Sequence, residues 1–468
     1  MSQSKNRQDE NLPIWLPRLA VHGGPRFLQI AEALQAAVAD GSLKPGDRLP
    51  PQRQLAAQLD VDLTTITRAY DEARRRNLLE GRGARGTYIA APKVELTSIL
   101  DLSMNTPPPP DGVDFDDMLK QGLSQVLMRA DNELLMTYHL AGGSDSDRKA
   151  GAKWLAPMFG HLDSRQLVVC PGAQAAIAAL ILALTAPGDV ILAEPMSYPG
   201  LRAAAAQFGR HIIAVAADQH GMVPEMLEEA CRRHKPGLLY LNPTLQNPTA
   251  ITIPQRRRKE LASIAKRCNV RIVEDDPYWL LADAPPPPVA TFAPEQVVYI
   301  STLSKCLTPG LRVAFVLIRD PHERELFLVA LRSFALMVAP LTAALATQWI
   351  FDGSAGGLME GVRNEARLRH RMARDILAGR YNSAAAGDGL HVWLELPAYW
   401  NSSQLARAAD SEGIAVTPAE AFATGSESVN AIRISLGSIK DRGRLQAGLQ
   451  RLSHLLARRP ESFSAAAV

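Results

Sequence analysis

One lysine in the C-terminal half of the chain has neighbours that suit it for covalent chemistry. Lys305 lies between two apolar runs, residues 297–300 and 313–318, whose β-branched residues predict short buried strands. Burial would lower the pKa of its amine and make it a nucleophile for Schiff-base formation. Nearby donors that could hold a phosphate dianion are Ser301, Thr302, Ser304 and Arg312. Taken alone, the segment fits an ordinary loop lysine equally well.

The elements that would position this lysine alternate along the chain. Strand-like apolar runs alternate with helical patterns, at residues 167–169, 190–193, 211–214, 237–241, 270–273, 297–300 and 313–318. This alternation predicts an α/β fold, a mainly parallel sheet with helices on both faces, and ligands bind at the carboxyl ends of such strands. After the first run, Gly172 precedes an apolar helix predicted over residues 175–184. Its free amides would bind an anion, although a simple strand-to-helix turn explains the same residues.

The N-terminal part carries a different pattern, with helices predicted over residues 27–38, 52–59 and 63–75. Asp62 is suited to cap the third helix, because its carboxylate can accept from the free amides of the first turn. Two short helices joined by a tight turn, the second rich in Thr and Arg, are what a helix-turn-helix needs. The glycines of residues 80–89 allow a β-hairpin wing. The arginines of this part, taken alone, would indicate no more than a solvated face.

Composition narrows the class of protein. The 468 residues suggest about two or three domains, and the apolar and charged fractions, 47% and 21%, are those of a soluble globular protein. The four cysteines lack metal-ligand spacing, so no metal site is predicted, and they fit a reducing cytoplasm. Residues 1–12 are too polar for a secretory signal, and the longest apolar run, 175–186, is too short for a membrane span. These features predict a cytoplasmic protein without membrane attachment.

Two sets of motifs carry a family resemblance. The turn LKPGDRLP at residues 43–50, the run Arg53-Gln54-Leu55-Ala56 and the ending RGTYIA at residues 85–90 resemble the GntR winged helix. The segment around Lys305 resembles the cofactor-lysine motif of fold-type I pyridoxal-phosphate (PLP) enzymes, the aspartate aminotransferase class. The whole chain, over about residues 25–455, thus looks like a MocR-type regulator of the GntR family. The resemblance implies double-stranded operator DNA as a partner and PLP as the cofactor.

The resemblance and the patterns together give a domain plan. An N-terminal extension, residues 1–24, precedes a winged helix-turn-helix over residues 25–91, and a linker follows at residues 92–98. An aminotransferase-like domain occupies residues 99–468. Its small C-terminal α+β subdomain is expected at about residues 370–455.

The resemblance also implies contacts with PLP. Asp275 would pair with the pyridinium nitrogen, which offers a buried carboxylate the cation it needs and keeps the ring an electron sink. Asn247 and Tyr278 would bond to the phenolic oxygen, and Tyr198 would stack on the ring. The remaining contacts, chiefly to the phosphate, fall to Ala173, Gln174, Thr302, Ser304 and Arg312. Each residue also has a plainer explanation, such as a turn asparagine, an acidic loop or a core tyrosine.

Two further residues suggest an assembly and an effector. Tyr138 matches the family tyrosine that reaches the phosphate of the neighbouring subunit, which implies a homodimer with shared PLP sites. Arg433 matches the arginine that clamps a substrate α-carboxylate through a bidentate pair, and Asn247 would lie beside it.

The same resemblance assigns a DNA-binding surface. The recognition helix would present Thr64, Thr65, Thr67 and Arg68 to the major groove, while phosphate or minor-groove contacts would come from Arg53, Arg82 and Arg85. Two positions depart from the family pattern. Leu63 stands where the family usually has arginine, so the resemblance does not imply the base or phosphate contact common in the family at this position, and the operator sequence can differ. Ala250 stands where the family usually has glycine, which matters if the backbone there needs a positive φ.

Three functions fit these residues. The first is a transcriptional regulator that senses an amino compound, or PLP itself, through an aldimine at Lys305. The second is a working aminotransferase acting on an amino acid, in which Lys305 shuttles the proton. The third is a DNA-binding protein whose large domain only dimerises, which the lysine, aspartate and arginine set disfavours. The DNA-binding module favours the regulator, because a plain transaminase has no use for it, while turnover remains open.

Overall fold

The computed structural model describes residues 15–17, 19, 24–76, 78–81, 86–90, 99–129, 135–377, 388–425 and 429–459. The chain divides into two compact units, Met1–Ser98 and Ile99–Val468. The linker predicted at residues 92–98 lies outside the described residues.

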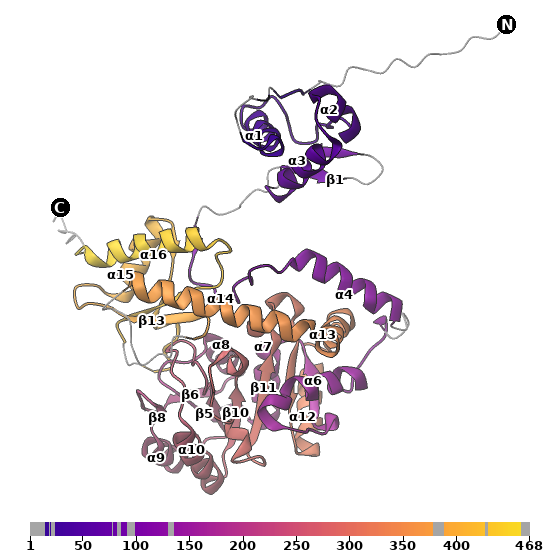
Figure 1. The fold of residues 1–468 in the computed structure, drawn as a ribbon. Coiled ribbons are helices and arrows are strands. Elements are labelled where there is room, and N and C mark those ends of the chain that lie inside the picture. The colour runs from indigo at the N-terminus through magenta and orange to yellow at the C-terminus, as the bar shows by residue number, and fades with distance from the viewer. Residues whose placement is uncertain are drawn as a thin grey trace. The chain divides into compact units, whose positions relative to one another are not determined.

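The first unit contains the predicted winged helix-turn-helix (Figure 1). Its helices are α1 (Arg26–Ala39), α2 (Gln52–Leu59) and α3 (Leu63–Arg75), and β1 (Leu79–Gly81) pairs antiparallel with β2 (Thr87–Ile89). Asp62 caps α3 as predicted, because its Oδ1 accepts from the Thr64 amide at 2.7 Å. The helices share a core that includes the fully buried side chains of Ile30, Leu34, Leu55, Ile66 and Tyr70.

The second unit is built on a seven-stranded sheet of order β4-β12-β11-β10-β9-β5-β6. The strands are β4 (Leu167–Cys170), β5 (Val190–Ala193), β6 (His211–Ala214), β9 (Leu238–Leu241), β10 (Arg271–Asp275), β11 (Val297–Thr302) and β12 (Ala314–Leu317). Each predicted run forms one of these strands. β12 runs antiparallel to both of its neighbours, β4 and β11, and the other pairings are parallel. The prediction of a mainly parallel α/β sheet is therefore confirmed.

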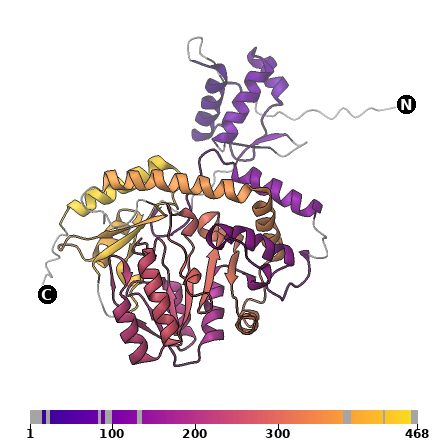
Figure 2. The same ribbon diagram turned by 60° about the horizontal axis from the view of Figure 1, so that its bottom comes forward.

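Helices cover both faces of this sheet (Figures 1 and 2), because successive strand residues point to opposite sides. One face packs against α7 (Ala173–Leu184), α8 (Pro199–Gln207) and α12 (Pro321–Arg332). The other face packs against α6 (Asp145–Phe159), α9 (Pro224–His234), α10 (Gln255–Cys268) and α13 (Pro340–Asp352). In β9, for example, Leu238 and Tyr240 join the first of these cores, and Leu239 and Leu241 join the second.

A smaller α+β part follows. The sheet β13 (His391–Glu395), β16 (Ala431–Ser435) and β15 (Thr417–Pro418) is antiparallel, and it packs with α15 (Ser402–Ser411) and α16 (Arg442–Ala457). The short β3 (Leu100–Asp101) pairs in parallel with β14 (Ile414–Ala415) beside them. The long α14 (Ser354–Ile376) extends from α13 to α16 (Figure 1). Among the described residues, no helix is both long and apolar enough to cross a membrane.

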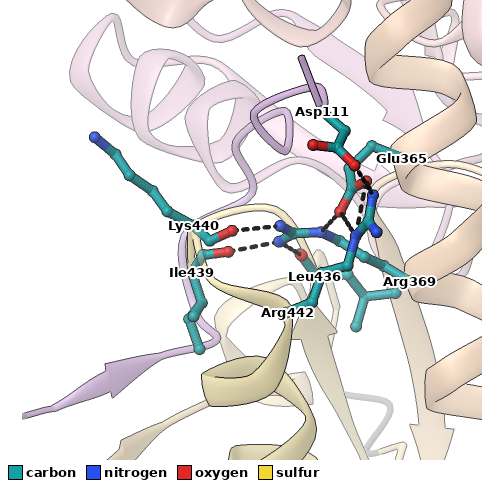
Figure 3. A network of polar contacts seen from close by, with 7 residues as sticks. All are labelled: Asp111, Glu365, Arg369, Leu436, Ile439, Lys440 and Arg442. Atoms are coloured by element: carbon teal, nitrogen blue, oxygen red, sulfur yellow. Dashed lines mark hydrogen bonds and ion pairs between the residues drawn. The ribbon is translucent and has the colours of Figure 1, made fainter. Parts of the chain in front are cut away.

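A buried ionic network fastens α14 to the small part (Figure 3). The Arg369 guanidinium donates to Glu365 Oε1 at 2.7 Å and to the carbonyl oxygens of Leu436, Ile439 and Lys440, at 2.8, 2.6 and 2.9 Å. Arg369 and Glu365 are 1% and 3% exposed. Arg442 donates to the same Glu365 carboxylate and pairs with Asp111 at 3.4 Å.

Candidate functional site

Lys305 belongs to the short helix α11 (Leu303–Cys306), which begins where β11 ends. Thr302 caps this helix, because its Oγ1 accepts from the Ser304 amide at 3.2 Å. The Lys305 Nζ donates to the carbonyl oxygen of Asn105 at 2.5 Å. Burial lowers the pKa of Lys305 to about 8, with a further lowering by Arg433 and an opposing effect of Asp275. A substantial fraction of this amine is therefore neutral and nucleophilic near pH 7.5.

Lys305 lines a cavity of about 140 Å³ at the carboxyl ends of β10 and β11. The other predicted cofactor residues that line it are Ala173, Gln174, Tyr198, Asn247, Asp275, Tyr278, Thr302, Ser304 and Arg312. Tyr138 is the predicted cofactor residue that does not line it, and its side chain is 70% exposed in this single chain. The fold thus brings together residues that are up to 139 positions apart in the sequence, from Ala173 to Arg312.

Asp275 ends β10 and supplies a buried carboxylate to the cavity. Its Oδ2 accepts from the Tyr240 hydroxyl at 2.7 Å, whereas its Oδ1 has no hydrogen-bond partner in the described part of the chain. Burial raises the pKa of Asp275 to about 6, although the Tyr240 hydrogen bond and the Lys305 charge lower it. A buried carboxylate with one free oxygen fits a cationic N–H donor such as a pyridinium nitrogen.

Replacing Asp275 with asparagine should stabilise the cofactor-free protein at pH 8 by up to about 3 kcal/mol. The folded-state pKa is raised, so the stability that this carboxyl contributes is present below about pH 4 and is lost as the pH rises through about 6. Denaturant unfolding at pH 8 and pH 5 measures the effect, which should shrink at the lower pH. An equal effect at both pH values would mean that ionisation of this carboxyl is not the cause.

The residues that line the cavity also include anion donors. Gly172 caps α7 with φ of +89°, so Ala173 and Gln174 begin the helix, two residues earlier than predicted. Free amides at a helix start attract anions. The Arg312 Nη2 donates to the carbonyl oxygen of Pro171 at 3.3 Å, and a Cβ at Gly172 would lie 2.6 Å from that nitrogen. Glycine is therefore needed both for the backbone angle and for the close approach of the guanidinium. This donor set fits a phosphate group.

Several residues that the sequence did not indicate complete the site. The Asn105 Nδ2 donates to the Tyr278 hydroxyl at 2.9 Å and lies 3.1 Å from the His391 Nδ1. The His391 Nε2 lies 3.3 Å from the carbonyl oxygen of Gln246, which fixes the proton on Nε2 and leaves Nδ1 to accept from Asn105. Burial holds the pKa of His391 well below its ordinary value, so the ring is neutral.

Two further unpredicted residues support the carboxylate and the loop after β9. Tyr240 points from the middle of that strand to Asp275. Asn242 donates to the carbonyl oxygen of Asp275 at 2.5 Å and accepts from the Asn247 amide at 2.7 Å. A tyrosine inside an apolar strand and an asparagine before a proline carry no sequence signal that separates them from core and turn residues.

Arg433 lies in β16 and is only 7% exposed. Its Nη1 donates to the Asn247 Oδ1 at 2.8 Å, its Nη2 donates to the carbonyl oxygen of Ser103, and its guanidinium lies 4.9 Å from the centre of the Phe422 ring. Its Nε has no partner within the described residues. Burial lowers the pKa of Arg433, and the nearby Tyr278 and Asp101 oppose this shift.

Ala250 adopts φ of +58°, the left-handed region that glycine favours. Holding alanine there costs about 1–2 kcal/mol. Ala250→Gly should therefore leave the free energy of unfolding nearly unchanged. Relief of the backbone strain stabilises the variant, whereas loss of the buried methyl group and the greater freedom of glycine in the unfolded chain destabilise it by a similar amount. The same change at Ala262, which is equally buried (2% exposed) within α10, should cost about 1–2 kcal/mol. Urea unfolding measures both variants, and equal losses would show that Ala250 is unstrained.

The predicted DNA-binding residues of the first unit lie on α2 and α3. Thr64, Thr67 and Arg68 are exposed on α3, Thr65 is partly exposed, and Arg53 is exposed on α2. The Thr67 hydroxyl also donates to the Gln52 Oε1 at 3.0 Å. Leu63 begins α3 and is 39% exposed, so it presents an apolar side chain at the start of the recognition helix. Arg82 and Arg85 lie outside the described residues.

Comparison with known proteins matches two families to this chain. Residues 97–452 match aminotransferase class I and II, and residues 27–89 match the bacterial regulatory proteins of the gntR family. The chain is 31% identical to the uncharacterized HTH-type transcriptional regulator YdeF of Bacillus subtilis, over 96% of this chain and 98% of that one. It is 26% identical to the HTH-type pyridoxine biosynthesis transcriptional regulator PdxR of Corynebacterium glutamicum, over 88% and 91%.

The fold of the second unit also matches that of a solved aminotransferase structure. LysN, the alpha-aminoadipate aminotransferase of Thermus thermophilus, complexed with N-(5'-phosphopyridoxyl)-L-leucine, superposes with a TM-score of 0.69 at 26% identity. The match covers 77% of this chain and 92% of that one.

The fold and the cavity define a DNA-binding protein with a fold-type I PLP domain. The chain belongs to the aminotransferase class I and II family and carries a gntR-family winged helix-turn-helix, and it is a transcriptional regulator of the MocR type. Its cofactor is PLP.

Proposed function

We propose that this protein regulates transcription by sensing an amino compound, or PLP itself, in the cavity around Lys305. One observation carries the proposal. A buried amine with a pKa of about 8 shares a cavity with a buried carboxylate that has a free oxygen, in a chain that also bears a DNA-binding module.

Different residues of the cavity would bind different parts of PLP. When bound, PLP supplies an aldehyde that condenses with amines and a pyridinium ring that withdraws electrons. Lys305 would provide the neutral amine, and the Asp275 Oδ1, which has no partner within the described residues, would accept from the ring nitrogen. The α7 amides of Ala173 and Gln174, with the Arg312 guanidinium, would bind the phosphate. Tyr278 and Asn247 supply donors for the phenolic oxygen.

If the effector is an amino compound and not PLP itself, we expect it to carry a carboxylate. Arg433 now donates to a neutral acceptor, the Asn247 Oδ1, and a carboxylate offers this guanidinium a stronger, charge-assisted partner. An effector amine that competes with Lys305 for the PLP aldehyde would leave the Lys305 amine unattached. Operator affinity then changes because the effector binds one arrangement of the large domain more tightly than another.

The working unit is a homodimer with shared sites. Tyr138 is too exposed for a cofactor residue in a single chain, and two methionines that precede it in the sequence, Met128 and Met136, are 75% and 88% exposed. Large apolar side chains exposed in this way favour burial against a second copy. The partner's Tyr138 would then complete the phosphate site.

A working aminotransferase is the second candidate. The observation that favours it is the buried Lys305 amine, whose pKa of about 8 lets it take and return a proton near neutral pH. Catalytic turnover and regulation use the same residues, so only measurement separates them.

The discriminating experiment adds single amino acids to the PLP-loaded protein. Cofactor absorbance follows occupancy of the site, and fluorescence anisotropy follows binding to DNA from upstream of the protein's own gene. We expect one class of amino acid to alter the absorbance and to shift operator affinity by about 5–150-fold. The matching amine without a carboxylate should do neither. Repeated turnover with a keto acid, at unchanged operator affinity, would replace the regulator proposal with the enzyme.

A further inference from the structure

A single segment connects the cofactor cavity to the start of the second unit. This strap, residues 99–111, begins directly after Ser98, the last residue of the unit that bears the DNA-binding helices. Its first residues are fixed by backbone pairing, since the amides of Leu100 and Leu102 donate to the carbonyl oxygens of Gly413 and Ala415, both at 2.8 Å. The strap therefore starts as a strand of the small α+β part.

The middle of the strap contacts Lys305 and Arg433, the amine and the guanidinium of the candidate site. The carbonyl oxygen of Asn105 accepts from the Lys305 Nζ at 2.5 Å, and that of Ser103 accepts from the Arg433 Nη2. The Asn105 side chain holds Tyr278 and His391, and the residue is only 5% exposed. Ser103 keeps two other donors at 3.3 Å, the hydroxyls of Thr417 and Ser435, so the Asn105 carbonyl depends more on its cation.

The far end of the strap is also fixed. A Cβ at Gly437 would lie 1.8 Å from the carbonyl oxygen of Thr106, so the backbones touch there. Asp111 then pairs with Arg442 at the edge of the network that holds α14 (Figure 3). The strap is therefore held by backbone contacts on both sides of Asn105.

We propose that the strap reports whether Lys305 is joined to the cofactor and transmits that state toward the DNA-binding unit. The inference rests on the proposed function. Joining Nζ to the aldehyde carbon of PLP expels one water, made from the aldehyde oxygen and two amine hydrogens, so Lys305 loses donors to the Asn105 carbonyl. An effector amine that takes the aldehyde carbon passes its two hydrogens to Nζ and restores them. The Asn105 carbonyl thus gains a charge-assisted bond when effector binds and loses it when effector leaves.

Hydrogen exchange on the full-length protein tests the strap without knowing the effector. Pyridoxamine 5'-phosphate has the ring and phosphate of PLP but an amine in place of the aldehyde, so it leaves Lys305 free. Peptides covering residues 99–111 should exchange about tenfold faster with PLP than with pyridoxamine 5'-phosphate, whereas α10 peptides should not change. Equal exchange in the two states would overturn the strap.

A variant pair tests the transmission. Asn105→Ala keeps the backbone carbonyl but removes the side-chain bonds to Tyr278 and His391 that hold this residue beside Lys305. Met104→Ala, at an adjacent position that is 61% exposed, is the matched control. Operator affinity with saturating PLP and with pyridoxamine 5'-phosphate should differ at least about fivefold in the wild-type and Met104→Ala proteins, and should not differ in Asn105→Ala. A wild-type difference that survives in Asn105→Ala refutes the role of this residue. If operator affinity is the same with both ligands while strap exchange responds, the proposed function and the transmission are refuted, and only the response of the strap to the Lys305 state is supported.

Discussion

Replacing Lys305 with alanine should abolish the adduct that borohydride reduction fixes between PLP and the protein. The reason is geometric, since Lys305 is the lysine that lines the cavity with Asp275, Tyr198 and Arg312. Mass spectrometry of reduced, digested protein locates the adduct. Lys149→Ala is a suitable control, because Lys149 is an exposed lysine that pairs with Asp145 on the surface, and it should keep the full adduct. An adduct that persists in Lys305→Ala would refute the assignment.

The same lysine sets a pH dependence. Attachment of PLP requires the neutral amine, so the rate should rise with pH and level off above about 8, the pKa to which burial lowers Lys305. Affinity for PLP in Lys305→Ala should fall at least about tenfold, or about 1.4 kcal/mol, because only noncovalent contacts remain. Absorbance after rapid mixing at several pH values measures the rate. A rate that keeps rising beyond pH 9.5 would mean that the amine is not desolvated.

Replacing Arg369 with methionine should destabilise the second unit by about 3–5 kcal/mol. The substitution removes a buried donor from three carbonyl oxygens and leaves Glu365 with Arg442 as its remaining cation. Arg371→Met, on the same helix but at an exposed position, should stay within about 0.5 kcal/mol of wild type. Guanidinium unfolding of the PLP-loaded proteins measures both. Similar losses in the two variants would show that the network contributes nothing specific.

Acid should reduce the difference in stability between wild type and Arg369→Met. Burial alone would raise the pKa of Glu365, but hydrogen bonds from Arg442 and Arg369 outweigh it and hold the pKa below its ordinary value. The stability contributed by a carboxyl with a depressed pKa is present above its unfolded-state pKa and is lost as the pH falls through the folded-state value. Wild type should therefore lose stability below about pH 4.5 more steeply than Arg369→Met does.

The helices and strands were predictable because buried faces require apolar residues at regular spacing in the sequence. Each apolar run became a strand, and the boundaries of α2 and α3 follow from Asp62 and from the spacing of apolar residues. The direction of a strand could not be predicted in this way, because an apolar run has the same pattern whether the strand pairs parallel or antiparallel. The antiparallel course of β12 therefore needed the structure.

Some residues of the candidate site could be predicted from the sequence, and others could not. Residues at strand ends, such as Asp275 and Lys305, could be predicted, because parallel topology gathers those ends at one edge. Asn105 and His391 could not, since they reach the site from distant segments and interact through contacts that no local spacing encodes. The positive φ of Ala250 likewise depends on the path of the loop after β9, and alanine gives no sign of it.

The unpaired oxygen of Asp275 has a consequence for the life of the protein in a cell. A folded chain without its vitamin-derived partner carries a desolvated charge, and a ligand that binds only the native state removes that penalty. Molecules made during a shortage of vitamin B6 should open more often, and proteases destroy the opened form. The quantity of this regulator would then follow nutrient supply through degradation, in addition to any response at its promoters.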